Sequence, residues 1–277
     1  METQGTGKCV FVTGGSRGIG KGIALVMAEQ GYDVAFTYAT AVDQAMAAKA
    51  SIEALGRRCF VYQAELQRPD VPELVTRKAI EDLGRLDALV NNAGQTKLNS
   101  LFTAEAELMD FIFDLDLRAP ILCAKQAALH MREKGIRGAI VNITSTRAFR
   151  SYPEDALYGA AKAGLTRAAE SMATELAPFG IRMNCVAPGA TRVRGDGSDA
   201  DLRSGFAPKI PLGRYGTPRE MGYAVAWLCS EQAAYITGTT IKIDGGLILP
   251  GMPEDSSPEA GYGWGRMRYP SAPPGKG

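Results

Sequence analysis

The stretch Thr13–Gly20, which reads TGGSRGIG, decides the fold. The run KCVFVT at 8–13 leads into it and predicts a short buried strand, and residues 18–30 have the spacing of an amphipathic helix. A strand that passes through a glycine-rich turn into a helix brings free backbone N–H groups to face an anion. Gly14 would permit the tight turn, Gly18 the close approach of a pyrophosphate, and Gly20 the close packing of helix on strand.

Short apolar runs alternate with longer helical patterns along the rest of the chain. The predicted strands are 8–13, 33–38, 58–62, 86–91, 139–143, 181–187 and 239–243, and the predicted helices are 18–30, 41–55, 70–83, 105–134, 155–178 and 217–230. This alternation indicates βαβ units. We therefore predict an α/β fold of Rossmann type, with a doubly wound, roughly seven-stranded parallel sheet and helices on both faces. Ligands of such sheets bind at the carboxyl ends of the strands.

Two segments interrupt this alternation. Residues 192–212 are polar and contain three glycines, which is typical of either a mobile substrate lid or a loose connection. Residues 251–277 contain six Gly and five Pro in 27 positions, too few apolar residues for a core. That tail is either a flexible terminus or an arm that packs on a neighbouring subunit or beside its active site. We therefore predict a single domain over 1–250, followed by a C-terminal tail.

The composition argues against several classes of protein. The chain of 277 residues has 31 Lys and Arg against 30 Asp and Glu, so no basic excess indicates nucleic acid. No apolar run reaches the roughly 18 residues of a membrane span, and no signal peptide is apparent; we expect a cytoplasmic protein. The single histidine, His130, lies in a helical pattern, which argues against a Ser-His-Asp triad and a histidine metal site. The five cysteines have no Cys-x-x-Cys spacing, so we expect buried, reduced thiols and no metal.

Four further motifs follow the glycine-rich loop in order. They are Asn91-Asn92-Ala93-Gly94 after the fourth predicted strand, Ser145 with Tyr158 and Lys162 after the fifth, Pro188-Gly189 after the sixth, and Asp244-Gly245-Gly246 after the seventh. Together with the T-G-x-x-x-G-x-G spacing at 13–20, this order resembles that of the short-chain dehydrogenase/reductase family over about residues 7–247. The region 211–246 is similar to both 3-oxoacyl-thioester reductases and glucose 1-dehydrogenases. The resemblance implies an oxidoreductase that interconverts a ketone or aldehyde and an alcohol by hydride transfer.

The resemblance gives chemical roles to Ser145, Tyr158 and Lys162. Tyr158 and Lys162 are four residues apart on one predicted helix, so both project from the same face. A carbonyl oxygen that accepts a hydride develops negative charge, and needs a proton donor and a second hydrogen bond. The family pattern implies that Tyr158 is the general acid/base and that Ser145 orients the carbonyl. It also implies that Lys162 assists the tyrosine and holds the nicotinamide ribose.

Asp116 departs from the family pattern. The family usually has an asparagine at this position, where it supports a chain of water molecules leading to the lysine. We include Asp116 in the catalytic set. An ionised carboxylate would stabilise Lys162 as an ammonium ion and alter the pH profile, whereas a tolerated near-isostere would not.

The resemblance also implies a set of cofactor-binding residues. They are Gly14, Ser16, Arg17, Gly18, Ile19, Gly20, Glu65, Leu66, Asn92, Ala93, Gly94, Tyr158, Lys162, Pro188, Gly189 and Thr191. Relatives specific for NAD have an acid at the end of the second strand, and Tyr38 stands there instead. Arg17 resembles the arginine that pairs with the 2′-phosphate, so we predict NADP(H) over NAD(H). Val193 stands where the family often has a nicotinamide-binding threonine, and Thr191 is the predicted substitute.

The substrate is left open by the sequence. Arg147, Phe149, Arg150, Tyr152, Glu154 and Asp155 lie between Ser145 and Tyr158, and the segment 192–212 adds Arg192, Arg194 and Asp196. This polar set, with its arginines, flanks the expected pocket and fits a polar or anionic substrate, or ordinary solvated charges. The fold does not choose among the family's small-molecule carbonyl and alcohol substrates. One alternative is an NAD(P)-dependent sugar or polyol dehydrogenase, similar to glucose 1-dehydrogenase and working oxidatively. A non-catalytic dinucleotide-binding scaffold is the other alternative, although the Ser/Tyr/Lys set is intact. The family also implies a homotetramer, or a dimer.

Overall fold

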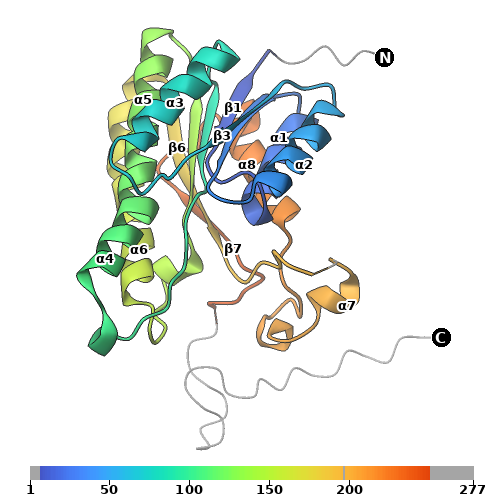
Figure 1. Cartoon of the computed structure of the whole chain (residues 1–277), viewed down its shortest axis with the longest axis vertical. Helices are drawn as coiled ribbons and strands as arrows, with labels where there is room; N and C mark the ends of the chain where they lie inside the picture. Colours follow the sequence, from blue (N-terminus) through green and yellow to red (C-terminus); the bar gives the residue numbers. More distant parts are fainter. Residues whose placement is uncertain (1–6, 196, 250–277) are drawn as a thin grey trace, which may run out of the picture.

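Seven parallel strands form one sheet through the centre of the molecule (Figure 1). The computed structural model describes residues 7–195 and 197–249. The strands are β1 (Cys9–Val12), β2 (Asp33–Tyr38), β3 (Cys59–Gln63), β4 (Ala88–Asn91), β5 (Ala139–Ile143), β6 (Arg182–Pro188) and β7 (Thr240–Ile243). Their order is β3-β2-β1-β4-β5-β6-β7. The strand order reverses between β1 and β4, the kind of position where such sheets bind ligands. The predicted Rossmann-type fold is confirmed.

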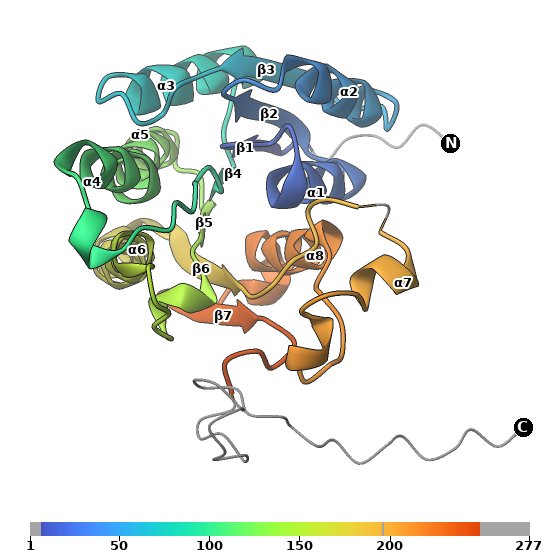
Figure 2. The same cartoon turned by 60° about the horizontal axis from the view of Figure 1, so that its bottom comes forward.

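Helices cover both faces of the sheet (Figure 2). Within the described residues they are α1 (Gly18–Glu29), α2 (Val42–Glu53), α3 (Val71–Leu83), α4 (Ala106–Phe113), α5 (Ala119–Glu133), α6 (Ala156–Leu176), α7 (Asp199–Leu202) and α8 (Pro218–Cys229). One face carries α1, α2 and α8, and the other carries α3, α5 and α6. Helix α4 packs on α6 through a small apolar cluster of its own.

The alternation of side chains along each strand divides the interior into two cores. In β1, Val10 and Val12 face the core under α1 and α8, while Cys9 and Phe11 face the core under α3 and α5. All four β1 side chains are buried, as expected for a parallel strand covered on both sides. The central strands are therefore covered on both faces, and the loops that leave their carboxyl ends start from the buried part of the sheet.

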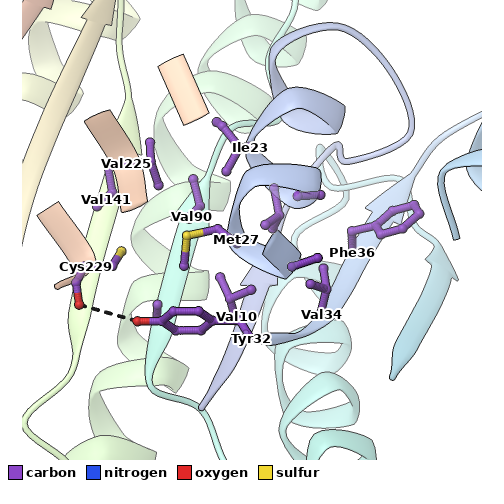
Figure 3. Packing of buried hydrophobic residues seen from close by; sticks show 14 of the residues in the cluster. Val10, Ile23, Met27, Tyr32, Val34, Phe36, Val90, Val141, Val225 and Cys229 are labelled. Carbon is purple, nitrogen blue, oxygen red and sulfur yellow. Dashed lines mark hydrogen bonds between the residues drawn. The ribbon is translucent and has the colours of Figure 1, made fainter. Parts of the chain in front are cut away.

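Figure 3 shows the core under α1. The labelled side chains of the sheet and of the helices above it meet there: Val10, Val34, Val90, Ile23, Met27 and Val225. The Tyr32 hydroxyl donates a hydrogen bond of 3.5 Å to the carbonyl oxygen of Cys229 at the edge of this core. This contact joins the turn before β2 to the end of α8.

The predicted helix over 105–134 is interrupted by one wide turn. Residues Asp114–Arg118 form a π-helical turn between α4 and α5, in which the Ala119 N–H donates to the Asp114 carbonyl. The physical reason is Pro120, which has no N–H to donate to the carbonyl of Asp116 four residues earlier. The wide turn accommodates the missing bond.

The segment 192–212 is organised around one arginine. The guanidinium of Arg192 donates to the Asp201 carbonyl at 2.9 Å and to the Ser204 hydroxyl at 2.7 Å. It also lies 4.1 Å from the centre of the Tyr215 ring. The described part of the segment is thus folded on itself and carries α7. The predicted tail at 251–277 lies outside the described residues.

The histidine and the cysteines have structural positions. His130 lies in the last turn of α5, where its Nε2 accepts the backbone N–H of Leu86 at 3.3 Å. Burial, together with Lys134, lowers the pKa of this imidazole. The five cysteines are buried and free, as predicted. Burial raises the pKa of Cys9 and of Cys185 to about 11, so these thiols are poor nucleophiles near neutral pH.

Candidate active site

A cleft of about 1320 Å³ lies at the carboxyl ends of the strands, and nearly all the predicted site residues line it. The lining residues follow β1, β2, β3, β4, β5 and β6 in turn. Ser145, Tyr158 and Lys162 are among them, and so is every predicted cofactor-site residue except Thr191. Asp116 lies behind the wall and is fully buried.

The glycine-rich loop has the backbone geometry that its sequence predicts. Gly14 has φ +69°, a conformation that favours glycine. A Cβ atom at Gly20 would overlap the carbonyl oxygen of Gly14, so only glycine lets α1 start this close to β1. Arg17 precedes the first helical residue and makes no side-chain cap. The first N–H groups of α1, at Gly18, Ile19 and Gly20, are therefore open to an anion in the cleft.

Two threonines and one asparagine hold this loop in position. The Thr13 hydroxyl accepts the backbone N–H groups of Asn92 at 2.9 Å and Ala93 at 3.0 Å. The Asn92 amide donates to the carbonyl oxygens of Thr13 and Gly14, at 2.9 and 3.0 Å. Thr37 accepts the Gly14 N–H at 2.9 Å. The sequence reasoning missed the role of both threonines. Their signal was a polar residue at or near the end of an apolar strand.

Lys162 and Asp116 form a buried ion pair behind the cleft wall. The Lys162 Nζ lies 3.0 Å from Oδ1 of Asp116, and the two side chains are 3% and 0% exposed. Nζ also donates to the Ile143 carbonyl at 3.2 Å. Burial lowers the pKa of Lys162, but the neighbouring groups, with the Asp116 carboxylate first among them, more than offset this, and the net shift is upward. Lys162 is therefore an ammonium ion throughout the neutral range.

Two backbone features complete the surroundings of Asp116. Its other oxygen, Oδ2, accepts the Gln95 N–H at 3.1 Å. A Cβ atom at Gly94 would overlap Asp116 Oδ1 and lie 3.1 Å from Lys162 Nζ. The glycine of the Asn-Asn-Ala-Gly motif thus leaves the space in which the ion pair forms.

The hydroxyl groups of Ser145 and Tyr158 are available to a ligand. Ser145 follows β5 by two residues, and its Oγ accepts the Arg147 N–H at 3.1 Å, which leaves its own hydrogen free to donate. Tyr158 is half-buried in the cleft wall on α6. The centre of its ring lies 5.6 Å from the Lys162 Nζ. Among the described residues, neither hydroxyl donates to a protein acceptor.

The end of β2 forms the far wall of the cleft. Tyr38, Ala39, Thr40 and Gln44 line it, together with Ala41, the residue before α2. Ala41 makes no side-chain cap, so the first turn of α2 is also open there. Across from this turn, Glu65 is exposed and Leu66 is 4% exposed. The sequence reasoning had not included Thr40, Ala41 or Gln44 in the site.

Large side chains line the cleft away from the β2 end, among them Phe111, Leu115, Arg147, Tyr152, Phe206 and Leu247. Val193, which Arg194 follows, also lines the cleft and lies beside the glycine-rich loop, where a Cβ atom at Gly18 would come within 3.4 Å of it. Thr191 is not among the lining residues, because its hydroxyl donates to the Gly189 carbonyl at 3.3 Å and its backbone bridges to Gly216. The predicted threonine substitution therefore has no support from the geometry. Phe111 and Leu115 were missed, since an apolar residue in a helical pattern looks like core.

Residues 7–195 and 197–249 contain no group of three or more His, Cys, Asp or Glu side chains that could hold a metal ion. None of their helices combines the length and the apolar character that crossing a membrane requires.

Comparison with known proteins finds relatives of this chain. Residues 14–248 match the family model described as enoyl-(acyl carrier protein) reductase. The chain is 38% identical over 246 residues to the 3-oxoacyl-[acyl-carrier-protein] reductase FabG of Staphylococcus epidermidis, covering 87% of this chain and 99% of that protein. It is 33% identical to an L-rhamnose 1-dehydrogenase (NAD(P)(+)) of a Sphingomonas species, with 88% and 97% covered.

A solved structure agrees with these sequence relatives. The acetoin dehydrogenase YohF of Salmonella typhimurium superposes with a TM-score of 0.84 at 36% identity, covering 87% of this chain and 96% of that one. The relatives share a fold and a class of chemistry, and their names differ in substrate. The chain belongs to the short-chain dehydrogenase/reductase family of oxidoreductases.

Proposed function

We propose that this protein reduces a ketone or aldehyde to an alcohol with NADPH, and catalyses the reverse reaction with NADP⁺. The supporting observation is that Ser145, Tyr158 and Lys162 line one end of a cleft whose other end is the glycine-rich loop. A bound nicotinamide would supply or accept the hydride. A cleft of about 1320 Å³ has room for a dinucleotide and a small substrate together.

The residues at 145, 158 and 162 would perform the proton chemistry. In reduction, the Tyr158 hydroxyl would donate its proton to the carbonyl oxygen as the hydride reaches the carbon, and the product is an alcohol. The free hydrogen of Ser145 would bond to the same oxygen and stabilise its developing charge. The Lys162 ammonium ion, 5.6 Å from the Tyr158 ring, would stabilise the phenolate that remains.

The cofactor would lie from the β2 end of the cleft to Lys162. The open N–H groups of α1 would bind the pyrophosphate, which the missing side chain at Gly20 lets approach. Leu66 and Glu65 would flank the adenine, and Asn92, Ala93, Gly94, Pro188 and Gly189 would border the nicotinamide half. The assignment of Thr191 to the nicotinamide amide stays a prediction.

Two features favour NADP(H) over NAD(H). Tyr38 ends β2 in place of an acid, so nothing at that position repels a 2′-phosphate. Arg17 and the open first turn of α2 line the same cleft, and both attract anions. An exposed acid at Asp43 in that first turn opposes them.

A second candidate is an NAD(P)-dependent sugar or polyol dehydrogenase that works oxidatively. The observation that favours it is the 33% identity to an L-rhamnose 1-dehydrogenase over nearly the whole domain. A polar substrate would also suit the arginines near Tyr158. The same three residues would act, with Tyr158 accepting the proton of the alcohol.

We also propose a homotetramer located in the cytoplasm. Tyr223, Trp227 and Tyr235 are 51%, 38% and 104% exposed on and after α8, which suits an interface between copies. Five free, buried thiols suit a reducing compartment.

Binding of NADPH and NADH to the purified protein, followed by turnover on ketones, 3-oxoacyl thioesters and aldoses, tests the proposal. We expect tighter NADPH binding and reduction of at least one carbonyl class. Stronger NADH binding with sugar oxidation would support the second candidate. Tight binding without turnover of any class would contradict both catalytic proposals and favour a non-catalytic scaffold.

A further inference from the structure

The charged residues on the cleft wall are mostly cations. Within the described residues, the wall contains Arg17, Arg147, Lys162 and Arg194, against one acid, Glu65. Glu65 follows β3 at the edge of the sheet, on the adenine side. Arg17 belongs to the glycine-rich loop, Arg194 follows Val193, which lies beside Gly18, and Lys162 is paired with Asp116. Among the described lining residues, the substrate end therefore carries the cation Arg147 and no acidic side chain.

Arg147 is the fixed cation at that end. Its Nη1 donates to Oδ1 of Asp155 at 2.7 Å, with the two side chains 30% and 3% exposed. Its guanidinium carbon lies 5.2 Å from the centre of the Tyr152 ring, a cation–π distance. The ion pair holds one edge of the guanidinium and the aromatic contact lies over it, so the group has a defined orientation.

The remaining N–H groups of Arg147, a residue that lines the cleft, have no partner among the described residues. A guanidinium has five N–H donors, and the hydrogen bond to Asp155 uses one of them. No other hydrogen bond from this side chain forms within the described residues. Asp155 is buried, whereas Arg147 is partly exposed on the wall, so an incoming substrate meets the cation rather than its partner.

Arg147 also lies next to the proposed chemistry in the chain. It follows Ser145 by two residues, and Asp155 precedes Tyr158 by three. The ion pair thus ties the loop after β5 to the start of α6, the two elements that carry the hydroxyl groups. A group bound by Arg147 would be held in the same space as the reacting carbonyl.

We propose that the substrate carries a carboxylate, and that Arg147 binds it while Ser145 and Tyr158 act on the carbonyl. A guanidinium offers paired N–H groups that match the two oxygens of a carboxylate. The substrate class is then an oxo acid, or the hydroxy acid in the reverse direction. Asp155 is a positioning residue that fixes Arg147. This inference rests on the proposed carbonyl–alcohol chemistry and narrows its substrate.

Matched acid and ester substrates test the proposal. Reduction is measured for 2-oxo, 3-oxo and 4-oxo acids and for their methyl esters, with NADPH and with NADH, in the wild type and in Arg147→Gln. We expect the variant to lower kcat/KM for the preferred acid by roughly 10- to 100-fold, the range of a charged hydrogen bond, and to change its ester by less than about threefold. For each substrate, kcat/KM of the variant is divided by kcat/KM of the wild type. The difference in intrinsic reactivity between an acid and its ester then cancels.

Three further variants separate binding from folding. Arg147→Gln leaves the Asp155 carboxylate buried without its partner, which can destabilise the protein. The double variant Arg147→Gln with Asp155→Asn removes both charges, and should fold while still losing the preference for the acid. Arg147→Lys keeps the positive charge and should retain part of the preference for the acid over its ester. Arg167→Gln on the exposed side of α6 is the matched control, and should change neither substrate.

The possible failures are distinguishable. Equal losses on acid and ester in the single and double variants would make the ion pair purely structural and overturn the inference. Turnover of neutral ketones without turnover of any acid would also overturn it, and would leave the proposed function standing. No turnover of any carbonyl compound or alcohol would contradict the proposed function itself.

Discussion

The two ends of the cleft differ in what forms their walls. At the glycine-rich end, the wall consists of backbone and small residues, and Thr13, Asn92 and Thr37 tie those loops to the sheet. At the Arg147 end, it consists of long side chains from the loop after β5, from α4 and from the π-helical turn. The first wall suits a dinucleotide, a group that many enzymes bind. The side chains of the second wall can be substituted without disturbing the sheet.

Because the two ends differ, mutations at each end should have different effects on binding and catalysis. A change at the glycine-rich end should affect cofactor binding with every substrate. A change at the Arg147 end should affect some substrates and leave the cofactor bound. Changes to the hydroxyl groups between the two ends should affect the chemical step.

Tyr158→Phe should give the largest loss. It removes the proposed proton donor, and general acid catalysis contributes about 10²- to 10⁴-fold to a rate. We expect kcat to fall by about three orders of magnitude while NADPH affinity changes little, measured by steady-state kinetics and fluorescence titration. Tyr62→Phe, on β3 outside the cleft, is the control. A kcat within tenfold of wild type would remove Tyr158 from its proposed role.

Gly20→Ala should disrupt the glycine-rich end. The added methyl group would overlap the Gly14 carbonyl oxygen, and such overpacking typically costs about 1–3 kcal/mol. We expect dinucleotide affinity to fall by roughly 100-fold, with a lower Tm, for all substrates alike. Gly164→Ala in α6 is the matched control, since its methyl group would meet only Leu117 at 3.5 Å. If Gly20→Ala bound the dinucleotide with wild-type affinity, the start of α1 could move away from Gly14 without loss of the binding site.

The same contrast explains what could be predicted from the sequence. The seven strands lie within about two residues of the predicted limits, because parallel strands covered on both faces are nearly continuous apolar runs. The loop at 13–20 was predictable because its glycines are required by contacts close in the chain. The site at that end follows from local sequence and strand order.

The Arg147 end depends on contacts that no local pattern encodes. Arg147 and Asp155 meet only because the intervening loop turns back, with Glu154 at φ +61°, a rare value for a residue other than glycine. Arg192 contacts the Tyr215 ring and does not line the cleft, and this placement depends on how residues 192–212 fold. Pro120 marks the position of the π-helical turn in the sequence. Helical periodicity alone does not predict that this turn places Asp116 in a buried contact with Lys162.

Arg17→Ala should affect the choice of cofactor more than the chemistry. Arg17 is exposed and lines the same cleft as the open first turn of α2. Losing one charged contact at such a site corresponds to roughly tenfold in affinity. We expect NADPH binding to weaken by about that factor and NADH binding to be nearly unchanged. Arg77→Ala on α3 is the control, and an equal loss for both cofactors would contradict the 2′-phosphate assignment.

Asp116→Asn should give the smallest change in rate and a distinct change in pH dependence. The Asp116 carboxylate raises the pKa of Lys162 against the opposing effect of burial, so its removal lets Lys162 lose its proton at lower pH. The high-pH limb of the rate–pH curve for oxidation, which reports loss of the Lys162 proton, should therefore move to lower pH, with kcat at the optimum within about tenfold of wild type.

Asp114→Asn provides the matched control for this curve. Asp114 lies on the same π-helical turn and forms a surface ion pair with Arg118, 2.6 Å away, rather than with Lys162. It removes the same charge from the same turn without touching the buried pair, and surface pairs contribute little. We expect its rate–pH curve to match the wild type. If Asp116→Asn also matches the wild type, the carboxylate is a tolerated replacement for the usual asparagine. If both variants shift alike, the effect comes from the charge of the turn and not from contact with Lys162.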